Sequence, residues 1–163
     1  MAVDLNYYTR QILRLLQQDA RRSKRELAQT LKVSVHVIDE SLKVIDSNGL
    51  ILDYGVTVDK HAVGCPLEVL CSIKLNWTIP NALKSFIEFT YEIPYIVKTQ
   101  AVTGEYDMLL TLYLPSFEQY QLQIYNELNN LDVVERVNTT VIMATAKNER
   151  LIPIDYNKGK YLD

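Results

Sequence analysis

The sequence is poor in the residue types that build metal centres. Its 163 residues include two cysteines, Cys65 and Cys71, and two histidines, His36 and His61. These residues do not give the four-ligand spacing of a zinc site, and Cys71 falls on the apolar face of a predicted strand. We therefore predict no metal site and no cofactor, and we expect Cys71 to be a buried thiol.

Long apolar runs and glycine-rich loops are also lacking. No apolar run approaches the roughly 18 residues that span a bilayer. The first ten residues are polar and lack a signal-peptide core, so we expect a cytoplasmic protein without a membrane partner. Neither a phosphate-binding glycine loop nor a nucleophile triad is recognisable. We therefore predict no catalytic residues and no enzymatic activity.

The composition is that of an ordinary globular chain with an uneven distribution of charge. Hydrophobic residues make up 48% and charged residues 23% of the sequence, and the length suits one large domain or two small ones. The net charge of −3 argues against nucleic acid, but residues 10–25 contain six basic side chains and one acid. A modest basic patch is therefore expected near the N-terminus.

Residues 1–49 carry three short helical patterns. Apolar residues at helical spacing predict the first helix over residues 5–19. A capping box from Ser23 to Glu26 predicts a second helix over residues 24–31. Ser34 offers an N-cap for a third helix, and Gly49 suits its left-handed C-cap. This pattern predicts a helix-turn-helix, with a helical dimerisation module as the alternative.

Candidate DNA contacts lie at the second and third helices. A helix-turn-helix places its last helix in the major groove, but the exposed face here carries Asp39 and Glu40. Acids repel phosphate, although a carboxylate can accept a hydrogen bond from a cytosine amino group. We expect Lys43 to pair with Asp39 and the basic cluster to supply phosphate affinity. The predicted DNA-binding residues are Arg21, Arg22, Lys24, Arg25, Ser34, His36 and Lys43.

The rest of the chain predicts a linker, a second domain and a tail. Residues 50–64 form a strand-like linker, residues 65–147 the second domain and residues 148–163 the tail. Alternating apolar residues predict four strands, at 67–75, 95–102, 106–114 and 133–146. Helical patterns follow the first and third strands, which gives the ferredoxin-like β-α-β-β-α-β order. We expect the apolar tail to pack against a sheet edge or a partner.

One face of the predicted sheet is left without helices. Both helices of a ferredoxin-like domain cover the same face of its antiparallel sheet. The opposite face carries the apolar residues Leu70, Leu109 and Ile142. An uncovered apolar face predicts association with another copy of the chain.

A glycine turn joins the second and third predicted strands. Gly104 permits a backbone conformation that side chains resist, and it leaves N–H groups accessible. Asp107 adds a carboxylate close by. Amide donors beside a carboxylate can hold a molecule with a negative and a positive end, of which an amino acid is the simplest. Alternatively, Asp107 pairs within the turn and Tyr106 belongs to the core.

Several motifs together resemble the Lrp/AsnC family, also called the feast/famine regulators, over about residues 3–147. The motifs are residues 12–21, Glu26-Leu27-Ala28, Val33-Ser34, Gly49-Leu50-Ile51 with Tyr54, Gly104-Glu105-Tyr106-Asp107, Thr140-Val141-Ile142 and Lys147.

The resemblance implies an α+β transcriptional regulator that binds double-stranded DNA. Its N-terminal domain would be a winged-type helix-turn-helix, and its C-terminal domain a ferredoxin-like βαββαβ ligand-sensing (RAM) domain. Family members form homodimers through their sheets, often assemble to octamers, and bind an effector, usually an amino acid, between dimers. The effector-binding residues that the resemblance implies are Gly104, Glu105, Tyr106, Asp107, Thr139 and Thr140.

Two departures from related patterns leave alternatives open. The third helix is less basic than is common in the family, which commonly has arginine at the position of Ser41. A sensing or interaction protein of the same fold with weak or lost DNA binding is therefore one alternative. A siroheme-decarboxylase-like enzyme is another, but such enzymes carry a histidine motif near the turn. Here both histidines fall outside the sensing domain.

Overall fold

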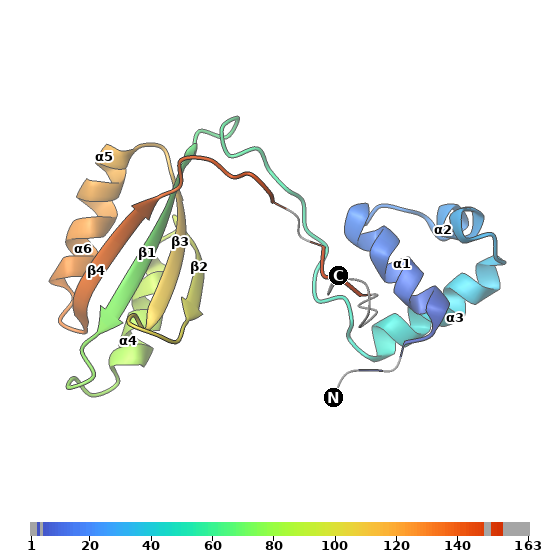
Figure 1. Ribbon diagram of the computed structural model, residues 1–163, viewed down its shortest axis with the longest axis horizontal. Helices are drawn as coiled ribbons and strands as arrows, with labels where there is room; N and C mark the ends of the chain where they lie inside the picture. The colour runs from blue at the N-terminus through green and yellow to red at the C-terminus, as the bar shows by residue number, and fades with distance from the viewer. Residues whose placement is uncertain (1–2, 4, 149–150, 155–163) are drawn as a thin grey trace, which may run out of the picture. The chain divides into compact units, whose positions relative to one another are not determined.

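A computed structural model describes residues 3, 5–148 and 151–154. The described residues form two compact units (Figure 1). The helical unit contains the described residues up to Val56 together with those from Lys147 onward. The sensing unit contains Thr57–Ala146. No helix among the described residues is long and apolar enough to cross a bilayer.

The helical unit contains the three predicted helices, α1 (Tyr7–Gln18), α2 (Lys24–Leu31) and α3 (Val35–Ser47). The capping box of α2 is confirmed, because Ser23 Oγ accepts from the Glu26 N–H while the Glu26 carboxylate accepts from the Ser23 N–H. Gly49 follows α3 with a left-handed φ of 57°, as predicted. The Ser34 side chain makes no capping hydrogen bond to α3.

Apolar side chains from all three helices form one core. Ile12, Leu27, Ile38 and Ile45 are almost completely buried. Ile154 of the tail packs against this core, whereas we expected the tail to pack against a sheet edge or a partner; tail residues 149–150 and 155–163 lie outside the described residues. The Gln17 side chain fixes the same segment, since it donates to the Ile152 carbonyl (3.3 Å) and accepts from the Ile152 N–H (2.7 Å).

The sensing unit has the predicted β-α-β-β-α-β order. Its four strands form one antiparallel sheet in the order β2-β3-β1-β4. The first half contains β1 (Leu67–Leu75), α4 (Ala82–Glu92) and β2 (Ile96–Ala101). The second half contains β3 (Met108–Leu114), then α5 (Phe117–Tyr120), η1 (Gln121–Tyr125) and α6 (Asn126–Asn130), and finally β4 (Val134–Val141).

The core of the sensing unit lies on one face of the sheet. Alternate residues of β1, such as Cys71 and Ile73, are completely buried and pack with Phe86 of α4 and Ile124 of η1. The residues between them point to the opposite face, because side chains alternate along a strand. We call this opposite side the open face; Leu70 and Leu109 lie on it and are half-buried.

Two predicted strands differ from the structure. The linker forms no strand over residues 50–58, and β4 ends at Val141 rather than at residue 146. A strand needs hydrogen-bonding partners on a neighbouring strand, and the linker side chains Leu52 and Val56 are 96% and 85% exposed. The strand-like interpretation of the linker is therefore wrong, since this single chain offers the linker no pairing strand among its described residues.

The second helical segment of the sensing unit contains a π-helical turn, η1, that the periodicity did not predict. Tyr120, Ile124 and Leu128 nevertheless remain buried along one side. Asn129 Nδ2 donates to the Tyr125 carbonyl at 2.6 Å, which satisfies a backbone acceptor at the end of the turn. The predicted apolar stripe is therefore preserved across the irregularity.

Candidate functional site

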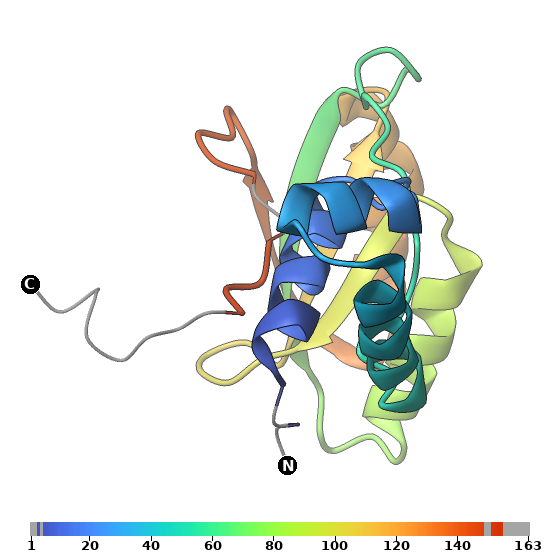
Figure 2. The same ribbon diagram turned by 90° about the vertical axis from the view of Figure 1, so that its right-hand side faces the viewer.

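The turn between β2 and β3 has accessible backbone donors. Gly104 has a φ of 117°, a conformation that L side chains rarely adopt. The turn, drawn as the yellow loop beyond the strand ends in Figure 2, is closed by the Val102 N–H, which donates to the Asp107 carbonyl (2.9 Å). Among the described residues, the N–H groups at positions 103–106 donate no hydrogen bond. They are therefore available to an anion.

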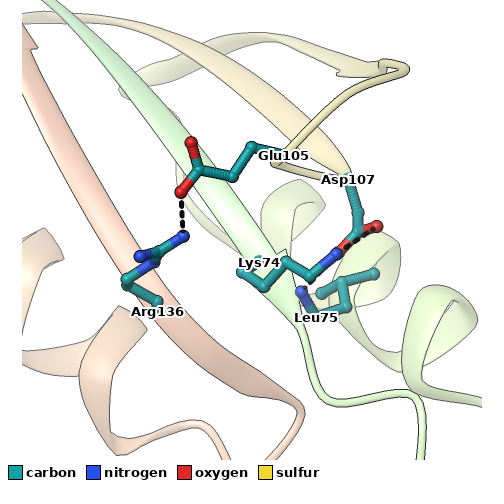
Figure 3. A network of polar contacts seen from close by, with 5 residues as sticks. All are labelled: Lys74, Leu75, Glu105, Asp107 and Arg136. Carbon is teal, nitrogen blue, oxygen red and sulfur yellow. Dashed lines mark hydrogen bonds and ion pairs between the residues drawn. The ribbon is translucent and has the colours of Figure 1, made fainter.

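Asp107 is bound by the chain itself. Its carboxylate accepts from the Leu75 N–H (2.9 Å) and from Lys74 Nζ (3.2 Å), as Figure 3 shows. Burial disfavours the charged form, but the Leu75, Lys74 and Trp77 hydrogen bonds outweigh burial and lower the pKa of Asp107 below its usual 3.8. Asp107 therefore stays ionised and joins the turn to β1.

Glu105 points the other way, toward β4. It forms an ion pair with Arg136, and the two side chains are 68% and 53% exposed (Figure 3). The Arg136 guanidinium lies 5.0 Å from the centre of the Tyr106 ring. The hydrogen bond from Arg136 to Glu105 raises the pKa of the guanidinium further. This pair is the accessible half of the site.

The sheet register explains why these charges meet. Lys74 on β1 and Arg136 on β4 are paired positions, so both side chains lie at the same end of the open face. With Glu105 and Asp107 they form what we call the turn cluster, which has two cations and two carboxylates. Our sequence prediction missed both cations, because only the long-range pairing of β1 with β4 brings them to the turn.

The two predicted threonines are placed elsewhere. The Thr139 hydroxyl is hydrogen-bonded to the Tyr120 hydroxyl, which also contacts the buried Cys71 thiol (3.3 Å), on the helix side of the sheet. Thr140 is opposite Leu70, four positions along β4 from Arg136, which corresponds to roughly 13 Å. The structure thus brings together residues 104–107 but not these threonines.

A hollow of about 500 Å³ lies beside β2. It is lined mainly by apolar side chains of α4 and β2, including Leu83 and Ile87, and it contains Lys98. Its end at Ala101 and Met108 adjoins the turn, since these two residues form the last paired position of β2 and β3. The hollow offers apolar contacts but few polar partners.

Two of the predicted DNA-binding lysines, Lys24 and Lys43, are paired with acids of the chain. Lys43 pairs with Glu40 at 2.8 Å, not with Asp39 as we expected. Asp39 is instead engaged by Lys24 of α2, at 2.6 Å. These contacts lower the pKa of both carboxyls, chiefly through the hydrogen bonds from the two lysines. Each of these two acids of α3 is therefore neutralised by a neighbouring lysine.

The remaining cations of this surface are less constrained. Arg21 lies 3.5 Å from Asp19 in an exposed pair. Arg22 and Arg25 form no ion pair with any described residue. Ser34 and His36 are exposed at the start of α3. Arg21 and Arg25, both exposed, are consequently the cations of α2 and its preceding turn that are most available to phosphate.

Within the described residues no three histidine, cysteine or acidic side chains lie close enough to hold a metal ion.

The helix-turn-helix and the ferredoxin-like domain with a charged turn define a transcriptional regulator with a DNA-binding and a ligand-binding domain. Residues 5–38 match the description winged helix-turn-helix DNA-binding, and residues 68–152 match the Lrp/AsnC ligand binding domain. The chain belongs to the Lrp/AsnC family.

Curated relatives match over nearly the whole chain. Transcriptional regulator AzlB of Bacillus subtilis is 26% identical over 95% of this chain and 99% of its own. The leucine-responsive regulatory protein of Escherichia coli is 27% identical over 93% of this chain and 92% of its own. Both relatives are named as regulators and not as enzymes, which argues against the decarboxylase alternative.

Solved structures show the same fold. A transcriptional regulator from Neisseria meningitidis in complex with L-Met has a TM-score of 0.84 and 19% identity, over 93% of this chain and 98% of that one. Escherichia coli AsnC has a TM-score of 0.81 and 18% identity, over 93% and 100% of the two chains. At these identities the likeness concerns the fold alone.

Proposed function

We propose that this regulator senses an amino acid at the turn cluster and binds DNA as a homodimer or larger assembly. The turn cluster carries the proposal. Lys74 and Arg136 face Glu105 and Asp107 beside unengaged turn N–H groups. Charges of both signs with free amide donors suit a zwitterion. The L-Met complex of a structural neighbour is consistent with this ligand class.

The open face supports association with a second copy. Leu70, Leu109 and Ile142 lie there without helices to cover them, and apolar patches of this kind mark interfaces. We place the effector between dimers because the turn lies at the end of this same face. An effector that favours one arrangement of dimers would change the spacing of the helix-turn-helix pairs on DNA.

A thermal-shift screen of the standard L-amino acids on the full chain tests the sensing proposal. A true effector stabilises the folded protein by mass action, by about 2.7 kcal/mol at a hundred times its Kd. A screen in which no amino acid raises the melting temperature would contradict amino-acid sensing. The fold and the DNA-binding proposal would be unaffected.

The DNA-binding proposal is tested by removing the exposed arginines. Arg21→Ala with Arg25→Ala should weaken binding to specific and nonspecific duplexes alike, because phosphate contacts carry no sequence information. The slope of log K against log salt should fall by about 2, close to one unit for each phosphate that an arginine no longer neutralises. Lys84→Ala with Lys98→Ala, in the sensing unit, removes the same charge and serves as the control.

The ion pairs of α3 favour the alternative of a sensing protein with weak DNA binding, since Lys24 and Lys43 are engaged by acids of the chain itself. Exposed pairs contribute little free energy, so phosphate can replace them. A gel-shift titration at low salt with genomic fragments separates the two cases. Absence of any shifted complex would favour the alternative.

A further inference from the structure

We propose that Arg136 and Glu105, not Asp107, are the groups that bind the charged ends of the effector. Arg136 would take the α-carboxylate and Glu105 the α-ammonium, so that effector binding replaces the ion pair between them. This inference rests on the proposed function and specifies which residues of the turn cluster recognise the ligand. It differs from our sequence-based expectation, which gave the ammonium to Asp107.

Asp107 is a poor partner for a ligand because its carboxylate is already satisfied. It accepts from the Leu75 N–H and from Lys74 Nζ, and its side chain is 18% exposed. A ligand ammonium there would have to displace Lys74, whose side chain is also largely covered. The exchange would leave a lysine without its partner at the sheet surface, which is unfavourable.

The Arg136–Glu105 pair has the opposite properties. Both side chains are mostly exposed, and the contact joins two flexible groups of a turn and an edge strand. Exposed pairs of this kind contribute little net stability. A zwitterion supplies each partner with a replacement of the opposite charge, so neither side chain is left unpaired after the exchange.

Tyr106 orients the arginine for this role. The Arg136 guanidinium carbon lies over the tyrosine ring, 5.0 Å from its centre, and this cation–π contact helps to hold the guanidinium beside the turn. A planar guanidinium presents paired N–H groups that match both oxygens of a carboxylate. The nearby N–H groups of residues 103–106 are unengaged among the described residues and can supply further donors to the same oxygens.

The arrangement predicts the chemical class of the ligand. A free α-amino acid satisfies both Arg136 and Glu105. Its primary amide lacks the charge for Arg136, and the corresponding acid without the amino group lacks the charge for Glu105. Either analogue should bind more weakly to the wild-type chain by about tenfold or more, because one charged side chain then loses its partner without compensation.

The test measures binding of the standard L-amino acids to the full-length chain through Trp77 fluorescence. Trp77 is the only tryptophan, and it lies two residues beyond Leu75, whose N–H donates to Asp107 of the turn cluster. For each amino acid that binds, the amide and the des-amino acid are then titrated. Arg136→Ala should bind the amino acid about tenfold more weakly and should no longer distinguish it from its amide. Glu105→Gln should no longer distinguish it from the des-amino acid.

Matched variants control for charge and for folding. Lys84→Ala and Glu92→Gln remove like charges from exposed positions of α4, on the other side of the sheet from the ion pair, and should bind as the wild type does. Arg136→Lys keeps the charge but not the planar fork, and it should retain part of the discrimination. Persistence of full discrimination in Arg136→Ala and Glu105→Gln would overturn this inference alone. Failure of the wild-type chain to bind any amino acid would overturn the proposed effector class as well.

Discussion

Two carboxylates of one turn have different environments, although only one residue separates them in the sequence. Asp107 is held by a backbone N–H of β1 and by Lys74, whereas Glu105 meets only the exposed Arg136 among the described residues. The Asp107 carboxylate is more buried than that of Glu105 and accepts from more donors. The residue types alone do not reveal this difference. We therefore assign Asp107 a mainly stabilising role and Glu105 a role in recognition.

Asp107→Asn should lower the free energy of unfolding of the sensing unit by about 1.5–3 kcal/mol at neutral pH, the range measured for hydrogen bonds to charged groups. The amide keeps the shape of the side chain but loses the charge that Lys74 faces. Urea unfolding followed by Trp77 fluorescence measures this value, because the single tryptophan lies in the sensing unit.

The loss of stability in Asp107→Asn should also depend on pH. The pKa of Asp107 is lower in the folded chain than its ordinary 3.8, so its ionised form stabilises folding above about pH 4. As the pH falls through the folded pKa, this contribution disappears and the gap between wild type and Asp107→Asn should close. Glu105→Gln is the control, with little loss at any pH; a gap that stays constant into acid would contradict the assignment.

At the scale of elements, the sequence predicted the helices, which depend on local signals, better than the neighbours across the sheet, which depend on long-range pairing of strands. The capping box at Ser23 and the C-cap glycine at Gly49 act within a few residues, and both were confirmed. The sequence also predicted the order of strands and helices along the chain and the turn at Gly104. Lys74 and Arg136 could not be placed from sequence, because a register between strands decides which side chains become neighbours.

Two of the wrong details, the partner of Lys43 and the strand pattern of the linker, have related causes. Helical spacing allowed Lys43 to reach either acid of α3, and the lysine that α2 supplies to Asp39 decides the pairing. The linker has a strand pattern, yet the described chain contains no partner strand for it. In both cases another element, not the local sequence, determines the outcome.

Ile154→Ser should destabilise the helical unit by about 1 kcal/mol, since it removes a partly buried apolar side chain from the core. Amide hydrogen exchange in α1 and α3 measures the local opening. Ile152→Ser is the matched control, because that side chain is 73% exposed and its backbone bonds to Gln17 remain. Equal protection in the two variants would show that the tail does not stabilise the helices.

At the scale of the whole molecule, the open face of the sheet is the surface that a second copy of the chain would cover. The sensing unit buries one face of its sheet under helices and leaves Leu70 and Leu109 on the open face. The turn cluster is at an end of this face. If copies associate there, assembly and effector binding are coupled, because each can alter the free energy of the other.

Leu109→Asp should therefore shift the chain toward the monomer without unfolding it, since a half-buried position on the open face tolerates a charge in one copy. In a symmetric interface the substitution places a charge in each apolar surface and desolvates both. Light scattering coupled to size exclusion measures the mass. Leu122→Asp, at a 65% exposed apolar position of η1, is the control and should leave the mass unchanged.

DNA binding should weaken only in Leu109→Asp, because a monomer presents a single helix-turn-helix to one half-site. Unchanged mass in Leu109→Asp would place the association elsewhere on the chain.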